Sequence, residues 1–149
     1  MKIEPIGFVR NEVLHPNNSE WGEEISEIIT KDEFTKGLIG LEEFTHAIIV
    51  FYMHQASYNE ERHLVRHPQN REELPKIGIF AQRARHRPNP IGITSVQIIG
   101  VEENILTVKG LDAINETPIL DIKPYFPDFD MRKDAETPEW VQEVMKYYF

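Results

Sequence analysis

Short segments rich in β-branched and aromatic residues recur along the chain, with turn residues between them about every dozen positions. The segments are 3–10, 24–30, 46–53, 78–81, 94–101, 105–111 and 119–125. Short strands with regular turn signals are typical of an all-β barrel or sandwich. No repeat or linker interrupts the pattern, so we expect one domain over residues 1–149.

Two of these segments carry additional information about their place in the sheet. Residues 47–53 form a continuous apolar run, which predicts a strand covered on both faces at the centre of the sheet. The apolar stretches 98–101 and 105–108 are joined by Glu102, Glu103 and Asn104. We predict an antiparallel hairpin here, with an exposed tip.

Two stretches have helical character. Near the end of the chain, Thr137 offers an N-cap, Pro138 a first helical residue and Glu139 an acid in the first turn. The apolar positions that follow at helical spacing are Val141, Val144, Met145 and Tyr148. We predict a C-terminal helix over about 137–148, packed on the β-structure or on a second subunit. The polar stretch 59–67 predicts a short helical connection that Pro68 ends.

Composition excludes several classes of protein. The chain has no cysteine, which removes disulfide scaffolds, thiolate metal sites and cysteine nucleophiles. No apolar run reaches the ~18 residues that a membrane span needs, and Glu4 and Pro5 stand where a signal peptide would be apolar. We therefore expect a cytoplasmic protein without a membrane partner.

The charge is unevenly distributed. The net charge is −9, the wrong sign for binding nucleic acid by bulk electrostatics. The segment from Lys76 to Val101, however, has no acidic residue and carries +4, which leaves −13 for the rest. This segment is either a basic contact surface or a solvated strand face.

The same basic segment contains a stiff loop. Pro88 and Pro90 fix their own φ angles and push Asn89 towards an extended conformation. The Asn89 amide can donate to and accept from a polar heterocycle, and Gly92, without a Cβ, permits close approach of backbone or ligand. The alternative is a simple turn between two strands.

A second cluster of polar residues follows near residue 121. Strand alternation places Asp121, Lys123 and Tyr125 on one face, and Leu120 and Ile122 on the other. Such a trio can bind the amino and carboxylate groups of an amino-acid-like ligand, or it can be a solvated face with a weak ion pair.

Histidines give little support for a metal. His63 and His67 have the spacing of two ligands on one helix face, but no third ligand follows at a suggestive spacing, and we predict no metal site. His54 ends the apolar strand, at a place where ligand sites gather, and either a structural or a functional role is open. The glycine-rich nucleotide motifs and the GxSxG motif are absent, which argues against Rossmann and P-loop enzymes.

Taken together, five blocks of sequence resemble the TrmO family, also called TsaA-like or YaeB. The blocks are 5–10, 40–46, 51–54, 78–92 and 110–125, and the resemblance covers about residues 5–130. It implies a small β-barrel that binds S-adenosyl-L-methionine without a Rossmann fold and acts as a homodimer, with the ligand near the subunit interface. It further implies methyl transfer to N6 of threonylcarbamoyl-modified adenosine beside the tRNA anticodon.

The resemblance also assigns residues to roles. Those it implies for cofactor binding are His54, Arg87, Pro88, Asn89, Pro90, Ile91, Gly92, Asp112 and Lys123. Asp121 is the candidate for polarising the attacking amine, with Tyr125 as the alternative. Arg83 and Arg85 are the candidates for binding tRNA, through the Lys76–Val101 segment. Two other hypotheses stay open, a methyltransferase acting on a small molecule, which the negative charge favours, and a non-catalytic module that binds the cofactor.

Overall fold

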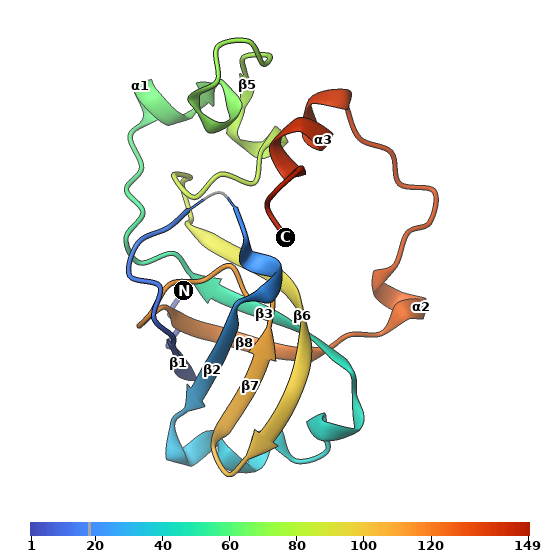
Figure 1. Cartoon of the computed structure of the whole chain (residues 1–149). Coiled ribbons are helices and arrows are strands. Elements are labelled where there is room, and N and C mark those ends of the chain that lie inside the picture. The colour runs from blue at the N-terminus through green and yellow to red at the C-terminus, as the bar shows by residue number, and fades with distance from the viewer. Residues whose placement is uncertain (18) are drawn as a thin grey trace.

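Six antiparallel strands close into a barrel in the computed structural model, which describes residues 1–17 and 19–149 (Figure 1). The barrel order is β1-β2-β7-β6-β3-β8. The bounds are β1 Gly7–Arg10, β2 Ile25–Thr30, β3 His46–Tyr52, β6 Ile91–Glu102, β7 Ile105–Lys109 and β8 Pro118–Pro124. The predicted all-β class is confirmed, and of the two architectures the sequence allowed it is the barrel.

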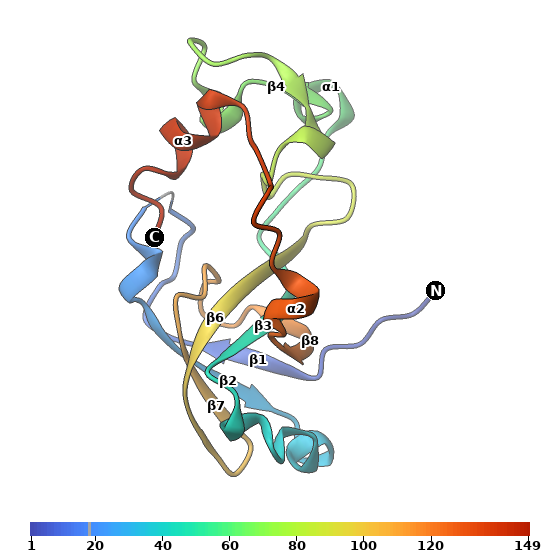
Figure 2. The ribbon, with the colours of Figure 1, turned by 90° about the vertical axis from the view of Figure 1, so that its right-hand side faces the viewer.

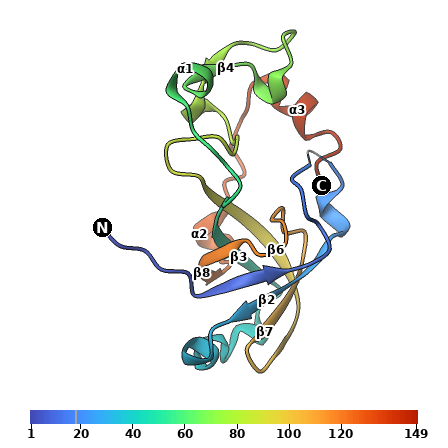
Figure 3. The same ribbon diagram turned by 90° about the vertical axis from the view of Figure 1, so that its left-hand side faces the viewer.

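Residues 54–90, between β3 and β6, leave the barrel and are called the excursion below. They contain α1 (Glu60–His63), β4 (Val65–Arg66), η4 (Pro68–Asn70), β5 (Ile77–Gly78) and η5 (Ile79–Ala81), with β4 and β5 paired in a separate two-stranded sheet. Figures 2 and 3 show this part standing clear of the barrel. Elsewhere the chain has three further 3-10 turns, η1 (Trp21–Glu23), η2 (Asp32–Leu38) and η3 (Leu41–Glu43), and the helices α2 (Pro127–Asp130) and α3 (Glu139–Met145). Of the helices described, none has the length and apolar character that crossing a membrane requires.

Two expectations about the excursion are wrong. The helical segment predicted over 59–67 is confined to α1, because Val65 pairs with Gly78 and draws the chain into β4. The strand predicted over 78–81 keeps only Gly78, at the end of β5, and residues 79–81 form the 3-10 turn η5. Both departures arise from pairing between residues that are distant in sequence, which a local pattern does not encode.

The C-terminal helix exists but is shorter than the predicted 137–148 and lies off the barrel, while its packing on a second subunit stays a prediction. Pro138, not Thr137, occupies the N-cap position of α3. The helix lies beside the excursion rather than on the barrel (Figures 1 and 2), and Gln69 Nε2 donates to the Val144 carbonyl at 3.3 Å. After α3, the Tyr148 hydroxyl reaches Asp112 in the connection between β7 and β8.

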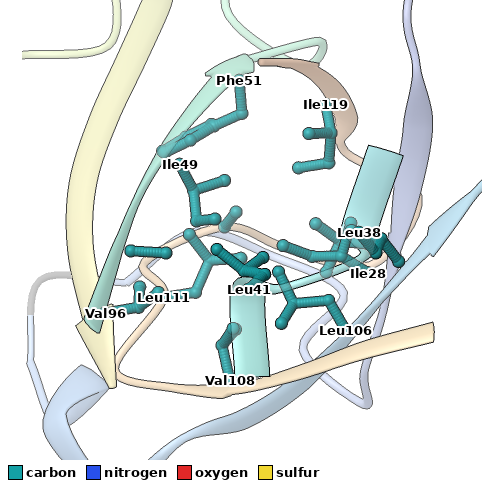
Figure 4. Packing of buried hydrophobic residues seen from close by; sticks show 13 residues of the cluster. Ile28, Leu38, Leu41, Ile49, Phe51, Val96, Leu106, Val108, Leu111 and Ile119 are labelled. Carbon is teal, nitrogen blue, oxygen red and sulfur yellow. The ribbon is translucent and has the colours of Figure 1, made fainter. Parts of the chain in front are cut away.

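The core fills the inside of the barrel (Figure 4). On β3, Ala47, Ile49 and Phe51 point inward and are buried, while Ile48 and Val50 alternate with them and are half-buried. The apolar run is therefore fully covered on its inner face only. The 98–108 hairpin is confirmed: β6 and β7 pair up to Glu102 and Ile105.

A β-bulge changes which side chains of β8 point into the core. The register of β8 on β3 shifts between Val50 and Phe51, which pair with Asp121 and Ile119. Because Leu120 is the extra residue, Ile119 and Ile122 both pack on the core. The predicted grouping of Leu120 with Ile122 is wrong, although Asp121 and Lys123 do lie together.

The packing of the core explains why residue 92 is a glycine. A Cβ built on Gly92 would stand 2.3 Å from the ring of Phe51, its partner across the β3–β6 ladder. Phe51 is only 3% exposed, so its ring has no free space to move into. The glycine is therefore required by packing, and the expectation that it opens space for a ligand is not needed to explain it.

We predict that Gly92→Ala destabilises the protein by about 1–3 kcal/mol, because the added methyl group overpacks the core. Gly100→Ala is the matched control on the same strand, since a Cβ there meets nothing within 4 Å. Chemical denaturation of both variants measures the difference. Equal losses of stability would show that the cost belongs to glycine replacement in β6 and not to the Phe51 contact.

Candidate functional site at the mouth of the barrel

The stiff loop, residues 87–92, returns the chain from the excursion to the barrel. It does so at the end of the barrel where β3 ends and β6 begins, which is called the mouth below. The Met53 amide donates to the Pro90 carbonyl at 2.8 Å, which extends the β3–β6 ladder by one step beyond the pair of Tyr52 with Ile91. The Ile91 amide donates to the Asn89 carbonyl at 2.7 Å and tightens the turn. The loop is thus fixed to the end of the strand that carries the core.

A second set of contacts holds the base of the loop. Arg87 Nη1 donates to the carbonyls of Gln82, at 3.1 Å, and Ala84, at 3.5 Å. Gln82 is itself buried, and its Nε2 donates to the carbonyls of Arg66 and Ile77 at 3.0 and 2.9 Å. Arg87 therefore closes the loop from inside, and its guanidinium is partly committed to the protein.

Asn89 is the loop residue most open to a ligand. It is exposed at the tip between the two prolines, and its side-chain amide makes no hydrogen bond with any residue that the structure describes. A fixed backbone with an unpaired amide provides one donor and one acceptor at a defined place.

His54 adds an unsatisfied polar atom next to the loop. It follows Met53, the residue that binds Pro90, and its Nδ1 is buried without a hydrogen-bond partner among the described residues. A buried nitrogen without a partner costs about 1–3 kcal/mol. This atom therefore points to a ligand or a water, which favours the functional interpretation of His54.

Asp112 lies on the other side of the mouth, in the connection between β7 and β8. Its Oδ1 accepts from the hydroxyl of the buried Thr94, and its Oδ2 accepts from the hydroxyl of Tyr148 at 2.6 Å. Burial raises the pKa of Tyr148, and the charge of Asp112 raises it further, so the phenol is a firm donor. Tyr148 was missed as a site residue because the sequence showed it only as an apolar helix position.

The arginines of the basic segment lie close to the same mouth. Arg83 Nη2 donates to the Ile93 carbonyl at 2.6 Å, directly after the loop, and Arg85 donates to His86 Nε2 at 3.0 Å; both arginines are exposed. The excursion as a whole holds seven Lys and Arg against four Glu. It is a basic part of an acidic chain.

Comparison with known proteins identifies the domain. Residues 9–131 match the model of the tRNA-methyltransferase O N-terminal domain. The chain belongs to this family. The match includes the whole barrel apart from its first two residues, the excursion and the loop.

Relatives and solved structures agree with the tRNA-methyltransferase O assignment. An S-adenosyl-L-methionine-binding protein of Archaeoglobus fulgidus is 37% identical over 140 residues, which is 91% of this chain and 97% of that protein. A tRNA (adenine(37)-N6)-methyltransferase of Rattus norvegicus is 39% identical over 99 residues, 66% of this chain and 22% of that protein. A crystal structure of TrmO from P. aeruginosa superposes with a TM-score of 0.76 at 29% identity, covering 94% of this chain and 61% of that one.

The chain is shorter than several of these relatives. It spans about half (53%) of a probable S-adenosyl-L-methionine-binding protein of Pyrococcus abyssi, to which it is 44% identical over 103 residues, or 69% of this chain. The family assignment therefore describes the barrel domain.

The tRNA-methyltransferase O barrel places its two catalytic candidates, Asp121 and Tyr125, at different distances from the loop. Asp121 forms an ion pair with Lys123, at 2.6 Å between Oδ2 and Nζ, and this hydrogen-bonded pair raises the pKa of Lys123. Asp121 also lines a cavity of about 510 Å³ with residues of η2 and η3, and its partner on β3 is Val50, two residues before Tyr52 at the loop end of that strand. Tyr125 lies at the other end of β3, with its ring on the edge of His46.

The two histidines with the sequence spacing of metal ligands, His63 and His67, make separate contacts within the protein. His63 is the last residue of α1, stacks on His86 with ring centroids 4.9 Å apart, and accepts from the Asn59 amide through Nδ1. His67 lies beyond β4, and its Nδ1 contacts the Leu74 carbonyl at 2.7 Å. Because the helix ends at His63, the helical spacing on which the hypothesis depended is absent. Among the described residues, no three His, Asp or Glu side chains gather as metal ligands would.

Proposed function

We propose that this chain is an S-adenosyl-L-methionine-dependent methyltransferase that acts on N6 of threonylcarbamoyl-modified adenosine in the tRNA anticodon loop. The observation that carries the proposal is the tRNA-methyltransferase O match over residues 9–131, which takes in the loop and both sides of the barrel mouth. The name of the rat relative supports adenine N6 as the acceptor.

The residues at the mouth fit the cofactor. When bound, S-adenosyl-L-methionine supplies a methyl group made electrophilic by its sulfonium. The Asn89 amide and the unpartnered His54 Nδ1 are the polar groups free to bind its adenine or its amino-acid end. The carboxylate of Asp112 is a partner for the cationic sulfonium of the cofactor. It accepts two hydrogen bonds from the protein and keeps further lone pairs for a ligand. Arg87, Pro88 and Pro90 keep the loop rigid around these groups.

Catalysis here depends on positioning. A nucleophilic amine held in line with a methyl carbon at near-attack distance gains most of its acceleration from orientation. The remaining acceleration requires only a group that orients the amine and accepts its proton. Asp121 is the candidate for this group, with Tyr125 as the alternative. Within one protomer Tyr125 lies away from the loop and Asp121 lies one strand further from it than Val50, so the proposal brings both to this site through a second protomer.

A homodimer is accordingly part of the proposal. Next to the loop, the outer face of β3 and β6 exposes an apolar patch of Tyr52, Ile91 and Ile93, which are 41%, 41% and 50% exposed. Tyr52 pairs with Ile91 and Val50 with Ile93, so the patch is continuous across two strands. Contiguous exposed apolar residues mark interaction sites, and a second copy covering this patch places two sites at the interface.

The excursion is the proposed contact to tRNA. Lys76, Arg83 and Arg85 stand on it without an acid between Lys76 and Val101, and the flexible side chain of Arg85 is exposed. Phosphate contacts from such residues supply affinity without reading sequence. A cytoplasmic location follows from this substrate.

A second candidate function is a module that binds the cofactor without catalysis. It is favoured by one observation: the Archaeoglobus protein that this chain matches over 97% of its length is named for binding S-adenosyl-L-methionine and not for a reaction.

The decisive experiment combines binding and turnover. We predict that the chain binds S-adenosyl-L-methionine in calorimetry and methylates tRNA carrying threonylcarbamoyl-adenosine, detected by mass spectrometry of the nucleosides. Asn89→Ala is expected to weaken cofactor binding about three- to tenfold, the worth of one hydrogen bond, without lowering thermal stability.

Three outcomes separate the hypotheses. Cofactor binding with no methylation of modified tRNA supports the binding module. Methylation of a small molecule in place of tRNA supports the small-molecule enzyme. Unchanged affinity in Asn89→Ala shows that the loop is only a turn.

We predict that Arg85→Ala weakens tRNA binding and reduces the slope of log K against log salt concentration by about 1, because one phosphate contact is lost. Lys133→Ala removes an equal charge from an exposed position outside the excursion and serves as the control. Filter binding over a range of salt concentrations measures both. An identical slope in the two variants would remove the excursion from the RNA-binding surface.

We predict that Ile93→Glu converts a dimer into monomers, because a carboxylate in the patch loses its hydration on association. Ile25→Glu is the matched control: Ile25 is 48% exposed, but on β2, at another side of the barrel. Sedimentation equilibrium gives the masses. Dimers that persist in Ile93→Glu would place the interface elsewhere.

A further inference from the structure

The end of the chain is fastened to the barrel by backbone contacts. The amides of Glu20 and Trp21 donate to the carbonyls of Tyr147 and Tyr148 at 2.8 and 2.9 Å. A Cβ on Gly22 would stand 2.7 Å from the backbone of Phe149, so the tail and η1 pack in direct contact. Residues 146–149 are called the tail below, and Figure 1 shows the C-terminus beside η1.

The tail carries one side chain into the barrel mouth. The Tyr148 hydroxyl donates to Asp112 Oδ2 at 2.6 Å, while Thr94 donates to Oδ1 of the same carboxylate. The two donors come from separate parts of the chain, one from β6 and one from the tail. They fix the rotation of the carboxylate about its own bond, because each oxygen has its own partner.

This cluster borders the loop. Thr94 is two residues beyond Gly92 on β6, and the residue between them, Ile93, receives the hydrogen bond of Arg83. The positive charge of Arg83 lies close enough to Tyr148 to oppose the rise of its pKa. The tail, the start of β6 and the basic segment therefore meet at one point.

Tyr148 also lies outside the segment that defines the family. The tRNA-methyltransferase O match ends at residue 131, and α3 and the tail come after it. The excursion touches this added segment through Gln69 and the Val144 carbonyl. The segment thus connects the excursion to the barrel across the mouth, in addition to the two chain crossings at residues 53 and 91.

We infer that Tyr148 is a positioning residue for cofactor binding, acting through Asp112. This inference rests on the proposed function, since it requires the mouth of the barrel to be the cofactor site. The phenol holds the carboxylate in one orientation, and two of the carboxylate's lone pairs stay available for the cofactor. Without the hydroxyl, Asp112 keeps only Thr94 and is free to turn.

The test is Tyr148→Phe in the full chain, which keeps the ring and removes the hydroxyl. We expect the KM and Kd for S-adenosyl-L-methionine to rise about five- to tenfold, part of the worth of a hydrogen bond to a charged group, with kcat at saturating cofactor unchanged. Tyr147→Phe is the control, because Tyr147 is 67% exposed and its hydroxyl makes no hydrogen bond with any described residue, while its ring contact with Lys146 is kept in phenylalanine. In an Asp112→Asn background, Tyr148→Phe is expected to cause no further rise.

Several results would overturn the inference. A Kd in Tyr148→Phe equal to that of the unaltered chain shows that the contact serves stability alone, whether or not the melting temperature falls. Equal effects of Tyr148→Phe with and without Asp112→Asn show that Tyr148 does not act through the carboxylate. If the unaltered chain itself fails to bind the cofactor, the proposed function fails first, and that result is distinguished by the calorimetry of the unaltered chain.

Discussion

The position of the candidate site depends on the last pairs of the β3–β6 ladder. Phe51 fills the core opposite Gly92, and the next steps of the ladder, through Tyr52 and Met53, fix Ile91 and Pro90. A shift of one residue would turn every side chain of β6 to the other face and place a Cβ against the Phe51 ring. The packing of the core therefore sets where the rigid loop emerges, and the loop needs no ligand to find its place.

The strands were predictable because alternation and turn residues are local signals, and the barrel strands lie within a few residues of the expected segments. The excursion was not, because Val65 meets Gly78 through a pairing that no local pattern encodes. On β8 the alternation itself failed: the extra residue Leu120 brings Ile119 and Ile122 onto the same side. A bulge of this kind is stabilised by the neighbouring strand and leaves no mark in its own sequence.

The site, like the fold, was only partly predictable from the sequence. The stiffness of the loop follows from two prolines and was predictable, as was the Asp121–Lys123 pair. The bond between Tyr148 and Asp112 spans 36 positions and joins a connection of the barrel to the end of the chain, so only the fold reveals it. Asp121 shares a family block with residues near the loop, and β8 places it opposite Val50, which also pairs with Ile93 directly after the loop.

The uneven distribution of charge favours the approach of a polyanion from one side of the molecule. A chain of net charge −9 repels a polyanion over most of its surface, and screening limits that repulsion to about one Debye length, ~8 Å at physiological salt. The excursion, with its surplus of arginine and lysine, is the part where approach is favoured, and it joins the barrel through the loop. In the proposed function, a nucleic acid drawn to the excursion comes close to the loop that carries Asn89. In that proposal the acidic rest of the chain, which counts against RNA binding as a whole, favours approach of RNA from the side of the excursion.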